Sequence, residues 1–340
     1  MKKISRNKSK IQLFNSTKQQ NTKQNRRSAA PQTTSIKDKM KLPSPLKKYL
    51  QHNISNSSCR TGYTHLYSGL NPFNRSSVQS FRQSIRTNQF NQQTSGQAPG
   101  YVQANFVALP KLHAFDFLNF CLKNPKPCPL LAVTDAGSFT PSNVALNSDL
   151  RTDIPMYRLW ENGLLTNEMS DINHLWNQDM VGFLLGCSFS WEHVLSNAGY
   201  CPKHIVENKN VPMYRTNIKN QISGPFGGEL VVSMRPYKPC DIEAIARITG
   251  CYPGAHGGPI HWGDPKDIGV NVNVPDWGDA VTISNDEIPV FWACGVTPHT
   301  AIMDAKLPMV VTHAPGHMFI CDIKDEELYV ETDFEDSYGR

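Results

Sequence analysis

The sequence has no long apolar run and no motif for binding nucleotides. No stretch of about 18 apolar residues occurs in its 340 residues, so it predicts no transmembrane helix. It contains neither a G-x-x-x-x-G-K-[ST] phosphate loop nor a G-x-G-x-x-G dinucleotide fingerprint, and we therefore expect no nucleotide cofactor. The 9 cysteines are odd in number and show no C-x-x-C spacing, which favours reduced thiols in a non-secreted protein.

Acidic residues are almost missing from the first hundred positions. This part carries 18 Lys and Arg against the single acidic residue Asp38, whereas the rest carries 16 basic and 28 acidic residues. Residues 1–80 have few spaced apolar side chains, and we expect them to form a disordered basic leader. The composition resembles a mitochondrial transit peptide, which would place the protein in the matrix; otherwise we expect it in the cytoplasm. A tail for nucleic-acid or membrane surfaces and a plain solvated extension are the alternatives.

Residues 81–330 have the pattern of a single compact domain, followed by an acidic tail at 331–340. Strand and helix signals alternate without the regular spacing of a parallel βαβ array. We therefore expect an α+β (mixed α/β) fold with a mixed sheet and short helices. The domain is acidic and lacks an RNA-recognition signature, so we expect no nucleic-acid partner for it. The sequence does not set the oligomeric state.

Alternating or continuous apolar residues predict the strands of this domain. The pattern Ile268, Val270, Val272 and Val274 alternates strictly and predicts a half-buried strand. Further strands are expected at Val102–Leu109, Leu130–Thr134, Glu229–Arg235, Pro289–Cys294, Met309–Thr312 and Met318–Asp322.

Helical spacing predicts three further elements. Leu112, Phe115, Leu118 and Leu122 share one face of a helix predicted over Leu112–Lys123. A second helical stripe consists of Met180, Phe183, Leu184 and Cys187. The third helix is capped by Asp241, closed by Gly250, and buries Ile242, Ile245, Ala246 and Ile248.

Two arginines are the candidates for binding a carboxylate. Arg215 lies in the polar segment Asn210–Asn217 beside Tyr214 and Asn217, and an arginine fork binds a carboxylate through two hydrogen bonds. Arg235 ends a predicted strand, where side chains often line sites. The alternative for each arginine is an ordinary ion pair with an acidic residue of the protein.

Histidines in glycine-containing loops are the candidates for proton transfer or metal binding. His256, His261 and Asp264 lie within nine residues and are weak metal-ligand candidates, because their spacing matches no standard signature. His313 and His317 flank Pro315-Gly316, which excludes a helix and predicts a tight turn between two strands. Such a pair can transfer protons, or it can simply bond backbone groups and hold the strands together.

Two predicted helix starts offer anion-binding or nucleophilic groups. Ser188 and Thr297 lie where free N–H groups attract a substrate carboxylate, although Ser188 can also act only as a cap. Cys294 and Cys187 lie beside these starts, where a thiol with a lowered pKa can act as a nucleophile. The more ordinary interpretation is that both cysteines are core residues.

Nine motifs, in the same order along the chain, resemble those of the D-glutamate cyclase family. The resemblance covers residues 81–325, and the leader lies outside it. The family's usual Gly-Ala-Pro-like segment reads Gly257-Gly258-Pro259 here. The motifs are Ala98–Asn105, Asn124–Leu131, Asp149–Pro155, Gly186–Ser190, Asn210–Asn217, Ser233–Pro236, His256–Pro259, Phe291–Pro298 and Thr312–Phe319.

The resemblance implies a hydro-lyase that interconverts D-glutamate with 5-oxo-D-proline and water, in D-amino acid metabolism. It also implies a mitochondrial location for animal members and use of a divalent cation such as manganese. On this basis we expect Arg215 and Arg235 to hold carboxylates, with Tyr214, Asn217, Ser188 and Thr297 around the substrate. His313 and His317 would be base and acid. Action on another small carboxylic acid, hydrolysis by a cysteine, and non-catalytic binding of small acids remain alternatives.

Overall fold

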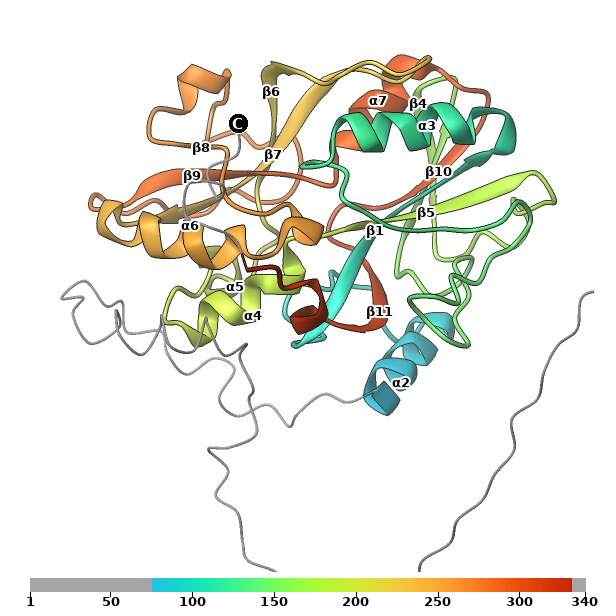
Figure 1. Cartoon of the computed structure of the whole chain (residues 1–340), viewed down its shortest axis with the longest axis horizontal. Helices are drawn as coiled ribbons and strands as arrows, with labels where there is room; N and C mark the ends of the chain where they lie inside the picture. The colour runs from blue at the N-terminus through green and yellow to red at the C-terminus, as the bar shows by residue number, and fades with distance from the viewer. Residues whose placement is uncertain (1–74, 332–340) are drawn as a thin grey trace, which may run out of the picture. The chain divides into compact units, whose positions relative to one another are not determined.

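The computed structural model describes residues 75–331, which form an α+β fold built on antiparallel sheets (Figure 1). The larger sheet has seven strands in the order β2-β5-β1-β10-β3-β4, and β11 also pairs with β1. The strands are β1 (Tyr101–Pro110), β2 (Leu130–Val133), β3 (Tyr157–Glu161), β4 (Leu164–Met169), β5 (Met180–Gly186), β10 (Val310–His313) and β11 (Phe319–Lys324). The α+β prediction is confirmed. The leader up to residue 74 and the tail from residue 332 lie outside the described residues.

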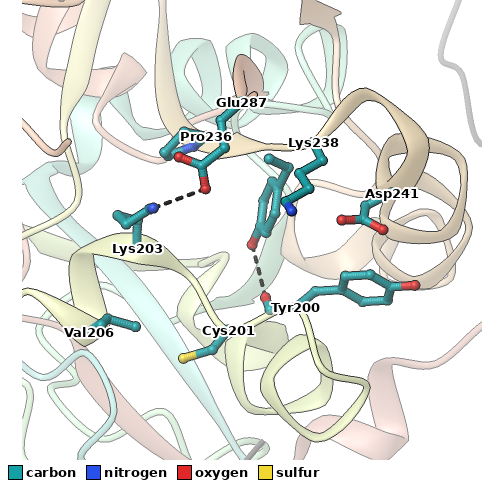
Figure 2. A pocket seen from close by; sticks show the side chains of 9 residues that line it. Tyr200, Cys201, Lys203, Val206, Pro236, Lys238, Asp241 and Glu287 are labelled. Atoms are coloured by element: carbon teal, nitrogen blue, oxygen red, sulfur yellow. Dashed lines mark hydrogen bonds and ion pairs between the residues drawn. The ribbon is translucent and has the colours of Figure 1, made fainter. Parts of the chain in front are cut away.

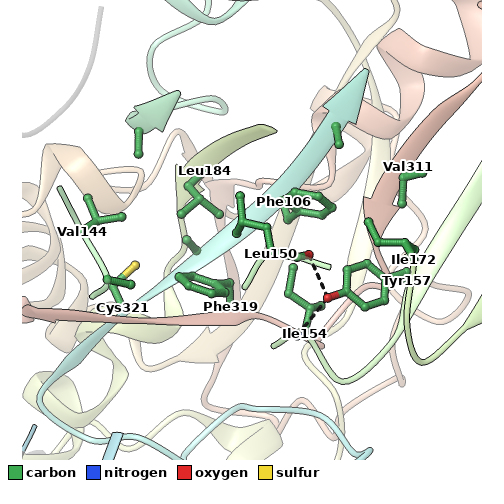
Figure 3. Packing of buried hydrophobic residues seen from close by; sticks show 14 of the residues in the cluster. Phe106, Val144, Leu150, Ile154, Tyr157, Ile172, Leu184, Val311, Phe319 and Cys321 are labelled. Carbon is green, nitrogen blue, oxygen red and sulfur yellow. Dashed lines mark hydrogen bonds between the residues drawn. The ribbon is translucent and has the colours of Figure 1, made fainter. Parts of the chain in front are cut away.

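The two faces of strand β1 pack against different groups of side chains. Alternate side chains of a strand point to opposite faces, and Phe106 with its even-numbered neighbours packs in a buried cluster around Tyr157 and Phe319 (Figure 3). On the other face, Val107 and Leu109 pack against α3 (Lys111–Lys123) and α7 (Thr297–Ala305). The polar residues Gln103 and Asn105 continue this second face. One face of β1 therefore changes from apolar to polar along its length.

The smaller sheet has the order β6-β7-β9-β8 and lies beside the polar half of β1. Its strands are β6 (Met213–Lys219), β7 (Glu229–Tyr237), β8 (His261–Trp262) and β9 (Ile288–Ala293). On β7, Val232 and Met234 point to one face, whereas Ser233 and Arg235 point to the other. The helices α4 (Phe189–Asn197), α5 (Lys203–Val206) and α6 (Ile242–Gly250) belong to this half of the fold (Figure 1). The predicted inward face of α6 is confirmed by a buried cluster.

Helix α3 is present as expected, but most of the apolar residues by whose spacing it was predicted are exposed. Leu112, Phe115 and Leu122 are 81%, 72% and 61% exposed, whereas Phe117 and Phe120 are buried. The helix carries apolar residues on both sides, so periodicity alone could not decide which side faces the sheet.

The first described helix, α2 (Arg75–Arg86), begins six residues before the predicted start of the domain at residue 81. Val78 is fully buried against Tyr101 and Ile320. The Arg82 guanidinium is buried and donates to the Ile320 carbonyl, and it lies 2.8 Å from an Asp322 carboxylate oxygen. Residues 75–80, which we had included in the disordered leader, are therefore helical and attached to the domain.

Two other predictions of elements were wrong. Met180–Gly186 forms the fully buried strand β5, not a helix, because it pairs on both sides with β1 and β2. Short apolar runs do not distinguish a buried strand from a buried helix. The alternating segment Ile268–Val274 buries Ile268 and Val270 but lies outside the strands, since it packs on the smaller sheet without pairing with it.

None of the helices within residues 75–331 has the length and apolarity needed to span a bilayer. The cysteines in this part of the chain are free thiols, and seven of the eight are buried.

Candidate functional site

Three polar groups border one buried apolar cluster where the two sheets meet. The cluster contains Cys187, Phe189, Val211, Met213, Val231, Cys294, Val296 and Met318. It connects the turn before α4, the strands β6 and β7, the turn before α7 and the segment before β11. Next to it, the Gly295 backbone lies directly against the Asn105 side chain, so that a Cβ atom at residue 295 would collide with the Asn105 amide. We take the surroundings of this cluster as the candidate site.

The first polar group is an ionic network centred on Arg235. Its guanidinium donates to the Glu192 carboxylate at 2.6 Å, to Ser188 Oγ at 2.9 Å and to Ser233 Oγ at 3.1 Å. The Trp191 and Trp292 rings lie 4.8 and 5.4 Å from the guanidinium carbon. Arg235 is fully buried and fully engaged, which favours a role in holding the site together over direct binding of substrate.

Glu192 receives a second partner in this network. His204 Nε2 lies 3.1 Å from the same carboxylate oxygen that Arg235 binds, and Ser95 Oγ donates to the other oxygen at 3.1 Å. Burial raises the pKa of the Glu192 carboxyl, but the charges of His204 and Arg235 outweigh it and lower the pKa to about 2. Glu192 is therefore an anion at cellular pH. Sequence reasoning missed both Glu192 and His204, because nothing in their local spacing indicates that they meet.

The second polar group is Arg215 on β6. Its guanidinium lies 5.6 Å from the Trp277 ring and 3.8 Å from the Met303 sulfur. Within residues 75–331 it takes part in no ion pair with a carboxylate. It is half-buried, and it lies on the same face of the smaller sheet as Met213, opposite Val231 of β7. Its backbone N–H donates to the Asp276 carboxylate at 2.8 Å, but the guanidinium itself has no carboxylate partner among these residues, which suits it to an anionic ligand.

The third polar group is a wide bulge between β10 and β11. Both strands run antiparallel to β1, since Thr312 pairs with Val107 and Phe319 pairs with Ala104. The six residues His313–Met318 thus lie opposite only two residues of β1, Asn105 and Phe106. The predicted tight turn between two strands is confirmed, since the His317 N–H donates to the Ala314 carbonyl at 2.9 Å across Pro315-Gly316, but the two strands continue along the same side of β1 and do not pair with each other as a hairpin.

Contacts with Asn210 and Thr94 fix this bulge. Gly316 has a φ of +86°, and a Cβ atom there would lie 2.6 Å from Asn210 Nδ2, so glycine is required. Asn210 donates to the Pro315 carbonyl at 3.3 Å. Thr94 Oγ1 accepts from the Met318 N–H at 3.0 Å.

The His313 ring lies where a neighbouring strand would otherwise pair with the backbone N–H and carbonyl of Phe106. Its Nδ1 lies 3.2 Å from both the Phe106 N–H nitrogen and the Phe106 carbonyl oxygen. The ring is buried, and its Nε2 has no hydrogen-bond partner among the described residues. Burial lowers the pKa of His313 to about 4, so the imidazole is neutral at cellular pH.

His317 differs from His313 in its surroundings. It is half-buried, and its Nδ1 lies 3.1 Å from the Pro315 carbonyl of the same bulge. Burial lowers its pKa as well. The two histidines therefore have unlike environments, and both carry the backbone contacts expected of a structural pair.

A third histidine, His299 of α7, lies beside His313. The two ring centroids are 5.5 Å apart in an edge-to-face arrangement, and the Trp160 ring lies 5.4 Å from His299 on another side. His299 is fully buried, and neither ring nitrogen has a partner within residues 75–331. The sequence alone indicates no role for this residue, since its neighbour in space is 14 residues away in the sequence.

The other predicted substrate residues lie in different places. Ser188 is in the Arg235 network, as described above. Thr297 is buried, and its Oγ1 lies 3.1 Å from the Val231 backbone nitrogen, where it links α7 to β7. Tyr214 points to the opposite face of the smaller sheet from Arg215, and its hydroxyl donates to the Val272 carbonyl. Asn217 is exposed near the end of β6.

The predicted metal ligands do not assemble. His256 is buried with Nδ1 2.8 Å from the Lys126 carbonyl, and His261 Nε2 lies 2.8 Å from the Asp264 backbone carbonyl. The Asp264 carboxylate accepts from the Lys266 N–H and caps a short 3-10 helix. Residues 75–331 contain no cluster of three His, Cys, Asp or Glu side chains suited to a metal ion. This trio therefore does not fit manganese.

Neither cysteine of the cluster is an activated nucleophile. Burial raises the pKa of Cys294 to about 11 and raises that of Cys187 further. A thiol in such surroundings carries little thiolate at cellular pH. The core interpretation of both residues is therefore favoured.

Two surface hollows lie away from the candidate site. The one in Figure 2 has a cavity volume of about 20 Å³ and is bordered by Lys203, whose Nζ lies 2.9 Å from a Glu287 carboxylate oxygen, and by Tyr237. A larger hollow of about 370 Å³ is bordered by Tyr101, Val144 and Lys324. None of the predicted site residues lines either hollow, so we define the candidate site by its side-chain contacts.

Comparison with known proteins decides the family. A family model described as D-glutamate cyclase matches residues 181–322. A Geobacillus kaustophilus protein named "Putative hydro-lyase GK2103" is 56% identical over 250 residues, covering 73% of this chain and 95% of its own. The chain belongs to the D-glutamate cyclase family.

A second hydro-lyase relative shows a similar extent of similarity, and one solved structure shows far less. A Bacillus subtilis protein named "Putative hydro-lyase YcsI" is 53% identical over 247 residues, with 72% of this chain and 96% of its own covered. A solved structure of a nitrogen repressor-like protein from Methanococcus jannaschii aligns with 69% of this chain and 95% of its own, at 11% identity and a TM-score of 0.25. The two hydro-lyase relatives are bacterial and give no support to the predicted mitochondrial transit segment.

Proposed function

We propose that this D-glutamate cyclase family member closes D-glutamate to 5-oxo-D-proline with release of water, and catalyses the reverse reaction. Family membership and the names of the relatives support a hydro-lyase. The choice of an anionic substrate rests on Arg215. Its half-buried guanidinium has no carboxylate partner within residues 75–331. D-Glutamate has two carboxylates, and Arg215 binds one of them bidentately.

The reaction requires two protons to move from nitrogen to oxygen. The substrate ammonium loses two protons, the amine nitrogen forms a bond to the side-chain carboxylate carbon, and one oxygen of that carboxylate leaves. The departing oxygen takes up both protons as water, so no net proton is consumed. His313 supports this chemistry because its imidazole is neutral and its Nε2 is not engaged by another described residue.

The buried network holds the cluster around which these groups lie. Arg235 ties Ser188 before α4 to Ser233 on β7, and Glu192 balances its charge. A site that must orient two carboxylates and an amine depends on such fixed neighbours. We therefore assign Arg235 and Glu192 as positioning residues.

A substrate screen tests this proposal. The purified chain is incubated with both glutamate enantiomers and with other small amino and hydroxy acids, with and without manganese, and products are separated on a chiral column. We expect turnover of D-glutamate above all others. Thermal stabilisation by acids without any product would instead indicate a binding protein.

Thiol alkylation separates the hydrolase alternative. Cys294 and Cys187 have raised pKa values, so iodoacetamide near neutral pH should leave activity intact while it labels the exposed Cys240. Loss of activity in step with modification of Cys294 would favour a cysteine mechanism.

A further inference from the structure

The strongest unexplained feature of the described residues is the pair His299 and His313. Between them they bury three imidazole nitrogens without a hydrogen-bond partner among residues 75–331: Nδ1 and Nε2 of His299 and Nε2 of His313. Each unpaired buried polar atom costs about 1–3 kcal/mol, so a native protein keeps such a group only for a reason. Apolar side chains at residue 299 would fill the same space without this cost.

The surroundings of the pair hold both rings in place. The Trp160 ring packs on His299, and its Nε1 donates to Thr312 Oγ1 at 2.9 Å, next to His313 in β10. On the other side, His313 is bound to the Phe106 backbone through Nδ1. The edge-to-face contact between the rings, with centroids 5.5 Å apart, therefore joins α7 to β10 through two fixed imidazoles.

Both imidazoles are kept neutral. Burial lowers the pKa of His299 well below its ordinary value, and the nearby charges of His313 and Arg158 lower it further. His317 and Arg158 act in the same direction on the pKa of His313. A neutral imidazole has one N–H donor and one bare nitrogen, so it can accept a proton at one nitrogen and release a proton from the other.

The Phe106 peptide allows His313 to exist in either neutral tautomer. When Nδ1 carries the proton it donates to the Phe106 carbonyl, and when Nδ1 is bare it accepts from the Phe106 N–H, since both atoms lie 3.2 Å away. Its Nε2 is then an acceptor in the first case and a donor in the second.

We propose that His299 and His313 form a proton relay, with a water molecule bound between their unpartnered nitrogens. This inference rests on the proposed function, because ring closure moves two protons from nitrogen to oxygen. His313 Nε2 takes the first proton from the substrate ammonium and passes it through the bound water to a bare nitrogen of His299. The first proton then returns along the same path to the side-chain carboxylate, and after the amine nitrogen has bonded to that carbon the second proton follows to the same oxygen, which leaves as water, so the two imidazoles never hold both protons at once. His299, and not the predicted His317, is the partner of His313.

Kinetics of the full-length chain test the relay. His299→Phe keeps a ring of similar size but removes both nitrogens, and His299→Gln keeps a polar group in case the first variant folds poorly. The control is His193→Gln, which removes a histidine that pairs with Asp325 outside the relay. We expect kcat per folded molecule to fall by about 10²-fold or more in both His299 variants, with little change in KM and none in the control. The dependence of kcat on the deuterium fraction of the solvent should change from curved in the wild type to linear.

Unchanged kcat per folded molecule in His299→Phe, or an unchanged solvent isotope dependence, would overturn the relay. A second measurement needs no substrate: ¹⁵N NMR of histidine-labelled protein at neutral pH reports the tautomers of His313. The relay predicts that His299→Phe changes the His313 tautomer ratio and that His193→Gln does not; an unchanged ratio refutes it. If the wild type does not convert D-glutamate at all, the proposed function fails, and the NMR result still decides whether the two histidines are coupled.

Discussion

Arg235 Nη2 donates a 2.6 Å hydrogen bond to Glu192 Oε1, and neither side chain is more than 1% exposed. This pair joins β7 of the smaller sheet to α4, which follows strand β5 of the larger one. Removing one partner of a buried ion pair leaves an uncompensated charge, which is far more costly than losing a surface pair.

Glu192→Gln should therefore destabilise the fold strongly. We expect a loss of about 3–5 kcal/mol in the free energy of unfolding, measured by urea denaturation, because the buried Arg235 guanidinium loses its counter-charge. The matched control is Glu243→Gln, which breaks an exposed pair with Arg247 and should cost less than about 1 kcal/mol. Equal effects of the two substitutions would mean that the buried pair does not stabilise the fold.

The same carboxylate predicts how stability depends on acid. The pKa of Glu192 is lowered to about 2 in the fold, against an ordinary value of 4.5. Its contribution is fully present above pH 4.5 and is lost as the pH falls towards 2. At about 1.4 kcal/mol per pKa unit it amounts to roughly 3 kcal/mol. The stability difference between wild type and Glu192→Gln should narrow below pH 4.5, and a constant difference down to pH 3 would contradict this.

Arg215→Lys should impair substrate binding without harming the fold. It keeps the charge but loses the bidentate fork, so kcat/KM should fall by about one to two orders of magnitude, or roughly 1.5–3 kcal/mol. Thermal stability should change little, because Arg215 is half-buried and joins no ion pair within residues 75–331. Arg247→Lys, at an exposed helix pair, is the control and should leave kinetics unchanged. Normal kinetics in Arg215→Lys would remove Arg215 from the site.

His313→Gln and His317→Gln should not be equivalent. We expect His313→Gln to lose roughly 10²–10⁴-fold in turnover per folded molecule, as for a general acid or base. The His313→Gln substitution should also remove the acid limb of the pH–rate profile near pH 4, where His313 becomes protonated. His317→Gln should be nearly as active as wild type, because His317 is half-buried and bonds only within its own bulge. Two folded and fully active variants would exclude this bulge from the mechanism.

The fold could be predicted where side-chain periodicity and burial agree. Helix α6 buries Ile242, Ile245 and Ile248 as its pattern requires. Strand β5 was mistaken for a helix because every residue from Met180 to Gly186 is buried, which removes the alternation that identifies a strand. In α3, apolar residues on both faces concealed which side meets the sheet.

The site could be predicted only in part, for a different physical reason. Arg215 and His313 carry recognisable chemistry in local motifs. The structure places Arg215 beside Met213 and Trp277 of the apolar cluster, and His313 at the start of the bulge whose last residue, Met318, belongs to that cluster. The partners that define their roles come from distant segments. Glu192 meets Arg235 from 43 residues away, and His313 meets Phe106 from 207 residues away. Spacing in one sequence holds no record of such contacts.

Hydration of 5-oxo-D-proline in oxygen-18 water tests the proposed reaction most directly. The purified full-length chain is incubated with this compound, and the product is examined by chiral separation and mass spectrometry. A hydro-lyase that opens the ring with solvent water should yield D-glutamate with one oxygen-18 atom in its side-chain carboxylate, and Arg215→Lys should yield far less. Absence of labelled D-glutamate from folded wild-type protein, with and without manganese, would contradict the proposed function.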